Sequence, residues 1–282
     1  PPLEIAGQPL KPIDYELPVA SAQVKTCVLL AGLYADGTTV VREPVRTRDH
    51  TEVALREFGA DVDIQRRVIS VKGRSPLRGR ELFVPGDLSS AAFFMVAALI
   101  VPGASLVING VGLNPTRSAL LDFLAGMGAN IKVQEVRQMS GEVVGDLLIK
   151  FGAIRGGVLE GALTAALIDE VPVLAILGAM SEDGLTVSDA AELRVKETDR
   201  IATVAENLKR MGVDVEVRAD GFRVPGRQKL RAAVLDSFGD HRIAMAFAIA
   251  ALAADGECAI DGAEAASVSF PEFYNTLRHI TS

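Results

Sequence analysis

The chain has 282 residues, 49% of them apolar, with no tryptophan and a formal net charge of −7. This length and composition are typical of a globular α/β protein with a sizeable core and two domains, and they exclude a disordered chain. The negative charge, without a compensating basic stripe, argues against a nucleic-acid-binding protein, whereas a local cluster of cations can still bind a small anion.

The sequence also argues against a membrane protein and against a metal site. The longest apolar runs, near residues 171–180 and 243–253, are too short to span a bilayer, and the N-terminus lacks a basic and apolar signal region. Cys27 and Cys258 lie far apart in apolar runs and are interpreted as reduced core residues. No His/Cys cluster indicates zinc. We therefore expect a cytoplasmic protein with no bound metal and no membrane partner.

The first 71 residues predict the order strand, helix, strand, helix, strand, strand. The expected elements are a strand over 13–17, a helix up to 35, a strand over 38–41, a helix over 51–58, and a strand from 59 paired in a hairpin with 68–71.

The same order then recurs, in copies that begin at Asp87, Asp169 and Gly239. Related signatures mark the start of the third strand of each complete copy: Gly-Ala-Asp-Val at 59–62, Gly-Ala-Asn-Ile at 128–131 and Gly-Val-Asp-Val at 212–215. The first helix of each copy is apolar nearly all round, which predicts that it is buried, with sheets outside. The Pro85-Gly86 pair predicts the boundary between a domain over 1–85 and a domain over 86–282.

The most charged stretch, residues 192–200, lies between an expected strand and an amphipathic helix over 201–211. Thr198 and Asp199 are good N-cap residues, so the stretch is expected to bring Lys196 and Glu197 to a helix N-terminus. A helix N-terminus favours anions, although a solvated, salt-bridged helix start is the other interpretation. The repeat is expected to place further polar and charged side chains at the same end of their domains: Ser21, Gln23, Arg48, Asp169, Asp240 and Arg242.

Four motifs give the chain a family resemblance. They are RVKETDR at 194–200, LPVASAQVK at 17–25, TRDHTE at 47–52 and GDHRIAM at 239–245. Through them the chain resembles the 5-enolpyruvylshikimate-3-phosphate (EPSP) synthase family from near Pro1 to near Ile280. The resemblance implies the enolpyruvyl transferase fold, an inside-out α/β barrel of repeated βαβαββ units. Residues 1–85 then form the last unit of an incomplete upper domain. Residues 86–282 form a lower domain of three units, the third without closing strands.

The resemblance also implies an activity, namely transfer of the enolpyruvyl group of phosphoenolpyruvate to the 5-hydroxyl of shikimate 3-phosphate, without a cofactor. Asp169, Lys196 and Glu197 would be catalytic, Asp169 accepting the hydroxyl proton and Glu197 exchanging a proton with C3 of phosphoenolpyruvate. The implied ligands of shikimate 3-phosphate are Ser21, Ala22, Gln23, Arg48, Asp169 and Lys196. Those of phosphoenolpyruvate are Gln23, Glu197, Arg200 and Arg242. His241 is interpreted as orienting its neighbours, and Glu52 and Asp240 as structural.

The chain departs from the family pattern at Val268, where well-known members carry Lys, and at Glu192, where some carry Asn. Family members also extend further at the N-terminus, so an N-terminal complementing segment is an expected partner. Three alternatives remain. UDP-N-acetylglucosamine enolpyruvyl transferase shares the fold, but it should lack RVKETDR and it depends on a Cys loop. The chain is otherwise a non-catalytic fragment that binds shikimate 3-phosphate or pairs with a partner chain, or a repeat scaffold without a small-molecule site.

Overall fold

The computed structural model describes residues 2–281, which divide into two compact units. Unit 1 contains the chain up to Pro85 together with Arg137–Val144, and unit 2 contains Gly86–Val136 and the chain from Gly145 onward. Within residues 2–281, no helix combines the length and the apolar character that crossing a membrane requires. Each unit has its own hydrophobic core and is described by itself.

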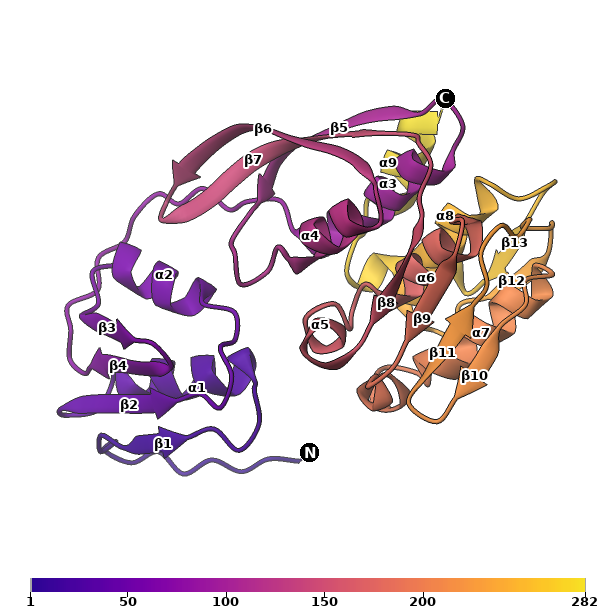
Figure 1. The fold of residues 1–282 in the computed structure, drawn as a ribbon. Coiled ribbons are helices and arrows are strands. Elements are labelled where there is room, and N and C mark those ends of the chain that lie inside the picture. The colour runs from indigo at the N-terminus through magenta and orange to yellow at the C-terminus, as the bar shows by residue number, and fades with distance from the viewer. Residues whose placement is uncertain (1, 282) are drawn as a thin grey trace. The chain divides into compact units, whose positions relative to one another are not determined.

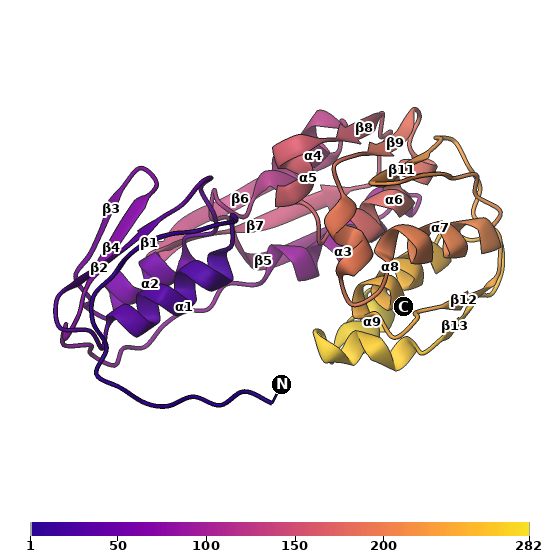
Figure 2. The same ribbon diagram turned by 90° about the horizontal axis from the view of Figure 1, so that it is seen from below.

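Unit 1 is a four-stranded sheet with two helices on one face (Figure 2). Its elements are β1 (Asp14–Glu16), α1 (Ala22–Gly32), β2 (Thr38–Arg42), α2 (His50–Glu57), β3 (Val62–Gln65) and β4 (Val68–Lys72). The strand order is β1-β2-β4-β3, with β1 parallel to β2 and the other pairs antiparallel. The tip of a hairpin completes the unit: Nδ1 of His50 lies 2.7 Å from Oε1 of Glu142, and the Phe83 N–H donates to Oγ of Ser140 at 2.9 Å.

Unit 2 is built around three helices that pack on one another, α3 (Leu88–Ile100), α6 (Val171–Met180) and α8 (His241–Ala251) (Figure 1). Nearly every residue of these helices is buried, which confirms the prediction from their all-round apolar sequence. The remaining elements are β5 (Ser105–Gly112), α4 (Ala119–Gly126), β6 (Asn130–Met139), β7 (Glu142–Lys150), β8 (Gly156–Leu159), α5 (Gly161–Ala166), β9 (Gly184–Val187), α7 (Arg200–Arg210), β10 (Glu216–Arg218), β11 (Gly221–Val224), β12 (Val234–Asp236), β13 (Ala259–Asp261), α9 (Phe273–Thr281) and two 3₁₀ helices, Ala191–Val195 and Ala263–Val268. The end of β6 and the start of β7 form the hairpin tip that belongs to unit 1.

The sheets of unit 2 repeat the pattern of unit 1. The sheet β8-β9-β11-β10 has the same strand order, again with a parallel first pair and antiparallel neighbours. In the β5-β7-β6 sheet, a parallel bridge from Gly86 to Val111 stands where the first strand would pair, and β12 pairs with β13 in parallel. The repeated βαβαββ unit therefore holds in three dimensions, and the sheets formed by residues 2–281 are open and close no barrel.

The recurring glycine of the sequence signature has a structural reason. Gly59, Gly128 and Gly212 each follow the last residues of a helix and adopt φ of +91°, +87° and +76°. This left-handed backbone ends a helix and is open to glycine at little cost. Each glycine therefore turns the chain from the second helix of a unit into its hairpin.

Two predictions about unit 1 are wrong, namely the burial of α1 and the core position of Cys27. Helix α1 is also rich in apolar residues, yet only Lys25, Leu29 and Gly32 in it are buried, and Val24 and Leu30 are exposed. Cys27, interpreted as a core residue, is exposed on this helix, and Cys258 is only half-buried. The difference in burial arises from the packing partners of each helix. Helices α3, α6 and α8 pack on one another, whereas within unit 1 the sheet packs along one side of α1.

Candidate functional site

A cluster of charged side chains in unit 2 lies at two helix N-termini. Asp199 caps α7, and its Oδ1 accepts from the Ala202 N–H at 3.0 Å. Asp240 caps α8, and its Oδ1 accepts from the Arg242 N–H at 2.8 Å. Each cap places the next one or two residues in a first helical turn, which positions Arg200 and Arg242.

Arg200 is the centre of this cluster and is only 1% exposed. Its Nε and Nη2 donate to the two carboxylate oxygens of Asp240 at 2.8 and 3.2 Å, a bidentate pair. Nη2 also donates to Oε2 of Glu197 at 2.6 Å. A buried guanidinium is thereby satisfied on one side by a buried carboxylate, and on the other it orients a carboxylate that is 51% exposed.

Asp169 collects three cations. Its Oδ1 lies 3.5 Å from Nη1 of Arg200 and 3.9 Å from Nζ of Lys196, and its Oδ2 lies 3.7 Å from Nη2 of Arg242. Nη1 of Arg242 also donates to the Asp169 carbonyl at 2.9 Å. Together with Glu197, these are the five unit 2 residues that the sequence predicts for the site, and the structure brings all five together.

Two other charged residues of the stretch 192–200, Arg194 and Glu192, make contacts of a different kind from those around Asp169. Arg194 donates to the carbonyls of Arg218 and Ala219 at 2.7 and 2.6 Å and pairs with Asp199 at 2.7 Å, so it fastens the stretch to the β10–β11 turn. Glu192, one of the departures from the family pattern, lies 2.5 Å from Nζ of Lys196. That contact places a competing carboxylate on a cation of the cluster.

The surroundings shift the protonation of two residues in the cluster. Burial alone would raise the pKa of Asp240, but the hydrogen bond and charge of Arg200 outweigh it and hold the pKa below the ordinary value. Burial, followed by the charge of Arg242, lowers the pKa of His241. Near neutral pH the imidazole is therefore held neutral, consistent with an orienting role.

The predicted residues of unit 1 lie on two neighbouring segments. Ser21 caps α1, its Oγ accepting from the Val24 N–H at 3.3 Å, and Ala22 and Gln23 follow in the first turn. Arg48 lies in the loop between β2 and α2. The side chains of Gln23 and Arg48 are exposed, and neither side chain makes a hydrogen bond or ion pair within residues 2–281. Their polar groups are thus available to a ligand.

No sequence pattern indicates a second group of buried polar side chains in unit 2, separate from Arg200 and Asp240. Glu170, next to Asp169, is buried, and its Oε1 accepts from Oγ of Ser89, to which Nη2 of Arg117 donates in turn. Burial raises the pKa of Glu170 despite the opposing effect of Arg117. A glutamate at the start of an apolar helix resembles a solvated first-turn residue, which is why the pattern was not informative.

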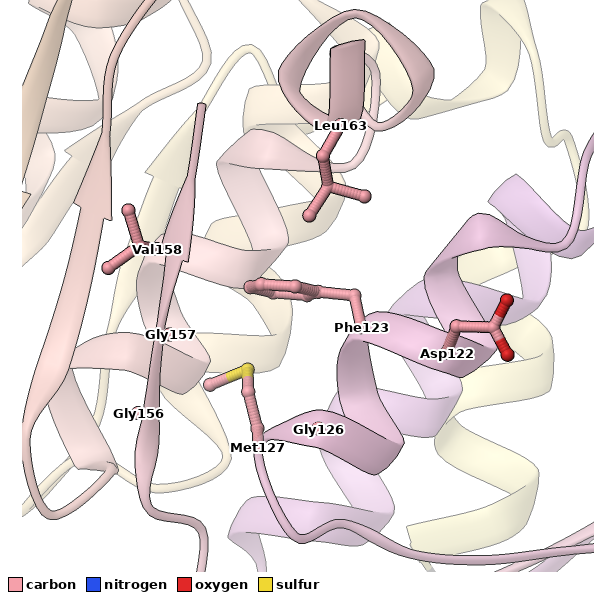
Figure 3. Close-up of a pocket in the computed structure, with 8 residues that line it drawn as sticks. All are labelled: Asp122, Phe123, Gly126, Met127, Gly156, Gly157, Val158 and Leu163. Carbon is pink, nitrogen blue, oxygen red and sulfur yellow. The ribbon is translucent and has the colours of Figure 1, made fainter. Parts of the chain in front are cut away.

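A cavity of about 400 Å³ in unit 2 is a different kind of feature (Figure 3). Phe123, Met127 and Leu163 line it, and the carboxylate of Asp122 points away from them. Its lining contains no cation, so it does not suit an anion. Among the residues that the structure describes, no group of three His, Cys, Asp or Glu side chains is placed to hold a metal ion.

Comparison with known proteins gives a consistent result. The sequence pattern of the family described as EPSP synthase (3-phosphoshikimate 1-carboxyvinyltransferase) matches residues 1–277. The 3-phosphoshikimate 1-carboxyvinyltransferase of Solibacter usitatus is 65% identical over 280 residues, which are 99% of this chain and 66% of that protein. That of Koribacter versatilis is 52% identical over 99% of this chain and 65% of its own length. The chain thus spans just under two thirds of these relatives.

Solved structures of enolpyruvyl transferases have a fold similar to that of this chain. The EPSP synthase of Acinetobacter baumannii superposes with a TM-score of 0.91 at 44% identity, covering 97% of this chain and 63% of the other. The enolpyruvyl transferase NikO of Streptomyces tendae superposes with a TM-score of 0.76 at 19% identity over 98% of this chain and 65% of the other. At that identity the second match supports the fold alone.

Proposed function

The chain belongs to the EPSP synthase family, and from that membership we propose that it takes part in transfer of the enolpyruvyl group from phosphoenolpyruvate to the 5-hydroxyl of shikimate 3-phosphate, with release of phosphate. The observation that carries the proposal is the cluster in unit 2, where Asp169 has three cations within 4 Å and Glu197 is held by buried Arg200. Both substrates are polyanions, and such a cluster offsets their mutual repulsion.

The reaction needs three proton transfers, which two carboxylates can perform. Protonation of C3 of phosphoenolpyruvate makes C2 electrophilic, and the 5-hydroxyl oxygen attacks C2 as its proton leaves. The tetrahedral intermediate then expels phosphate from C2 and loses a proton from C3, which restores the double bond. Asp169 is assigned as acceptor of the hydroxyl proton, and Glu197 as the group that gives and later retakes the C3 proton.

The cations have separate tasks in this assignment. Lys196, beside Asp169, stabilises the charge that develops when the hydroxyl loses its proton. Arg200 and Arg242 bind the carboxylate or phosphate of phosphoenolpyruvate, for which a planar guanidinium is suited. Arg200 has a second task, because the same guanidinium orients Glu197 at 2.6 Å.

Unit 1 is assigned the phosphate of shikimate 3-phosphate. Ser21, Ala22 and Gln23 form the first turn of α1, where N–H groups and the helix dipole favour an anion. Arg48 adds an exposed guanidinium without a competing partner among residues 2–281. Gln23 is also assigned a contact with phosphoenolpyruvate. A segment equivalent to the remaining third of the relatives is the proposed partner in turnover.

Calorimetry combined with a phosphate-release assay tests the proposal. Shikimate 3-phosphate is titrated into the chain first, and phosphoenolpyruvate is added second. Phosphate release is then followed with and without the N-terminal third of the Solibacter usitatus relative. We expect binding of shikimate 3-phosphate to the chain, and turnover when the segment is present. Binding without turnover under both conditions would favour a non-catalytic binding fragment. Absence of binding to either substrate would favour a repeat scaffold and contradict the proposal.

A further inference from the structure

Unit 1 holds a group of buried charged side chains to which the proposed reaction gives no task. Nζ of Lys25, on α1, lies 2.6 Å from Oε1 of Glu52 and 3.0 Å from Oε1 of Glu43. All three side chains are at most 2% exposed. We call Lys25, Glu43 and Glu52 the buried triad. Lys and Glu are almost never fully buried unless they are paired, so the triad needs a physical reason.

A gain in folding stability does not explain why the triad is buried. The formal charges of the triad sum to −1, and the desolvation of buried ion pairs tends to offset their attraction, so apolar side chains of similar volume would often be at least as stable. In addition, Oε2 of Glu52 and Nζ of Lys25 are buried without a well-aligned hydrogen bond in the described part of the chain, so the ammonium is held by its two ion pairs alone. An unpaired buried acceptor lowers stability further. The geometry that the triad imposes is the better explanation.

On one side the triad fixes the start of α1. Lys25 lies in the first turns of the helix, and its N–H donates to the Ser21 carbonyl at 3.1 Å. Gln23 is two residues before Lys25. The ammonium is therefore tied through the helix backbone to the turn that is assigned the phosphate.

On the other side the triad fixes both ends of the loop that carries Arg48. Glu43 follows β2, and its Oε1 accepts from the Thr47 N–H at 3.2 Å and from the Thr47 hydroxyl. Glu52 lies in α2, just beyond the loop. Thr47 immediately precedes Arg48, so the hydrogen bonds of Glu43 reach the backbone from which Arg48 projects.

We infer that Lys25 is a positioning residue, which, through Glu43 and Thr47, holds Arg48 where its guanidinium binds the same phosphate group as the first turn of α1. This inference rests on the proposed function, because the phosphate is that of shikimate 3-phosphate. Arg48 is exposed and has no partner of its own among residues 2–281, so only its backbone anchoring limits its reach. Fixing that backbone in advance lowers the entropy lost when the ligand binds.

Lys25→Met would leave two buried carboxylates unpaired and could prevent folding, so Lys25 itself is not substituted. The first test instead measures the energetic coupling between Thr47 and Arg48 in the binding of shikimate 3-phosphate. Thr47→Val keeps shape and volume close to those of Thr but removes the hydroxyl that Glu43 accepts. We expect about tenfold weaker binding of shikimate 3-phosphate by calorimetry, because a loop that is no longer held in advance loses more conformational entropy when Arg48 binds the ligand. In the Arg48→Ala background, Thr47→Val should have little further effect, because the guanidinium that it positions is gone.

The second test needs no ligand. Backbone hydrogen exchange over residues 44–49 should be faster in Thr47→Val than in the unchanged chain, while β2 and α1 keep their protection. The control is Arg46→Met in the same loop, which removes only an exposed ion pair with Asp49. That variant should bind shikimate 3-phosphate and exchange hydrogen like the unchanged chain.

The outcomes separate this inference from the proposed function. If Thr47→Val weakens binding equally with and without Arg48, or leaves exchange over residues 44–49 unchanged, Lys25 has no positioning role through Thr47 and the inference is overturned. If the unchanged chain fails to bind shikimate 3-phosphate, the proposed function fails. The exchange measurement then still decides whether the triad holds the loop.

Discussion

Each unit buries one cation completely, and the two are surrounded differently. Lys25 in unit 1 and Arg200 in unit 2 both have side chains that are 1% exposed. The partners of Lys25, Glu43 and Glu52, are themselves almost fully buried. Arg200 is paired with Asp240, which is buried, and with Glu197, which is half exposed.

The difference separates two uses of a buried charge. The Lys25 group is closed, so it can act only on the backbone segments that it joins. The Arg200 group is open at Glu197 and at Asp169, which is 26% exposed, so the same network that is anchored in the interior presents carboxylates to solvent. A planar guanidinium suits this second task, because it offers several donors in fixed directions, whereas an ammonium is a compact point charge.

The largest effect that follows from this comparison is on stability. Arg200→Met should lower the free energy of unfolding of unit 2 by about 3–5 kcal/mol, because Asp240 stays buried without its partner. The measurement is chemical denaturation followed by probes in each unit, since a chain with two units need not unfold in a single step. The control is Arg210→Met on the same helix, where the ion pair with Glu206 is partly exposed and should contribute less than about 1 kcal/mol. Equal losses of unfolding free energy in the two variants would mean that the buried pair stabilises unit 2 no more than the partly exposed pair does.

The next effect concerns the open side of the Arg200 group. Glu197→Gln keeps the shape of the side chain but removes the group that donates and later accepts the C3 proton. The kcat for phosphate release should therefore fall by about 100-fold or more while binding of shikimate 3-phosphate survives. If the chain alone is inactive, the assay adds the N-terminal third of the Solibacter usitatus relative. Glu192→Gln is the control, since it changes a carboxylate on Lys196 and not the one on Arg200. Undiminished turnover in Glu197→Gln would remove Glu197 from the mechanism.

How much of this was predictable depends on the range of the interactions. The order of elements, the buried helices α3, α6 and α8 and the helix-ending glycines follow from local pattern. No pattern in the sequence predicts an element over residues 156–166, where β8 and α5 lie. Short strands and a six-residue helix have little periodicity of their own, and their pairing partners are distant in the chain.

The site shows the same limit. The family resemblance named five residues of unit 2, Asp169 and four residues of the motifs, which the structure brings together. Within residues 192–200, however, no local feature separates Arg194 from Arg200. Arg194 donates hydrogen bonds to two backbone carbonyls, whereas Arg200 is buried and donates to the carboxylate of Asp240, 40 residues further along the chain. The local sequence also does not predict that Lys25 and Glu170 are buried, because charged residues near the start of a helix are usually solvated.

A smaller effect tests the role of geometry within the open group. Arg242→Lys keeps the charge near Asp169 but loses the two-pronged guanidinium. We expect the apparent affinity for phosphoenolpyruvate to fall about tenfold, roughly the contribution of one charge-assisted hydrogen bond, with little change for shikimate 3-phosphate. Competition calorimetry and the KM for phosphoenolpyruvate measure the two affinities separately. Unchanged affinity for phosphoenolpyruvate would make Arg242 a structural residue that holds the Asp169 carbonyl.

The smallest effect is expected for a carboxyl group that faces no substrate in this assignment, and it depends on pH. Burial raises the pKa of Glu170 in the folded chain above its ordinary value of 4.5. As pH rises through 4.5, the unfolded chain ionises Glu170 while the folded chain still holds the proton, so this residue lowers the free energy of unfolding progressively. Glu170→Gln keeps an acceptor for the Ser89 hydroxyl and cannot ionise. The variant should therefore match the unchanged chain near pH 4 and become relatively more stable as pH rises.

Asp87 provides a matched comparison with the opposite sign, since it also lies near Arg117, at 3.5 Å. Burial would raise its pKa, but Arg117 and the hydrogen bonds from Ser90 outweigh burial and lower the pKa below 3.8. The stabilisation from Asp87 is therefore present above pH 3.8 and is lost as pH falls through the folded pKa. Asp87→Asn retains a good N-cap for α3 and should be less stable than the unchanged chain at neutral pH, with the difference shrinking in acid. Denaturation of unit 2 across pH 3–8 measures both variants. Slopes of the same sign would show that burial does not govern Glu170.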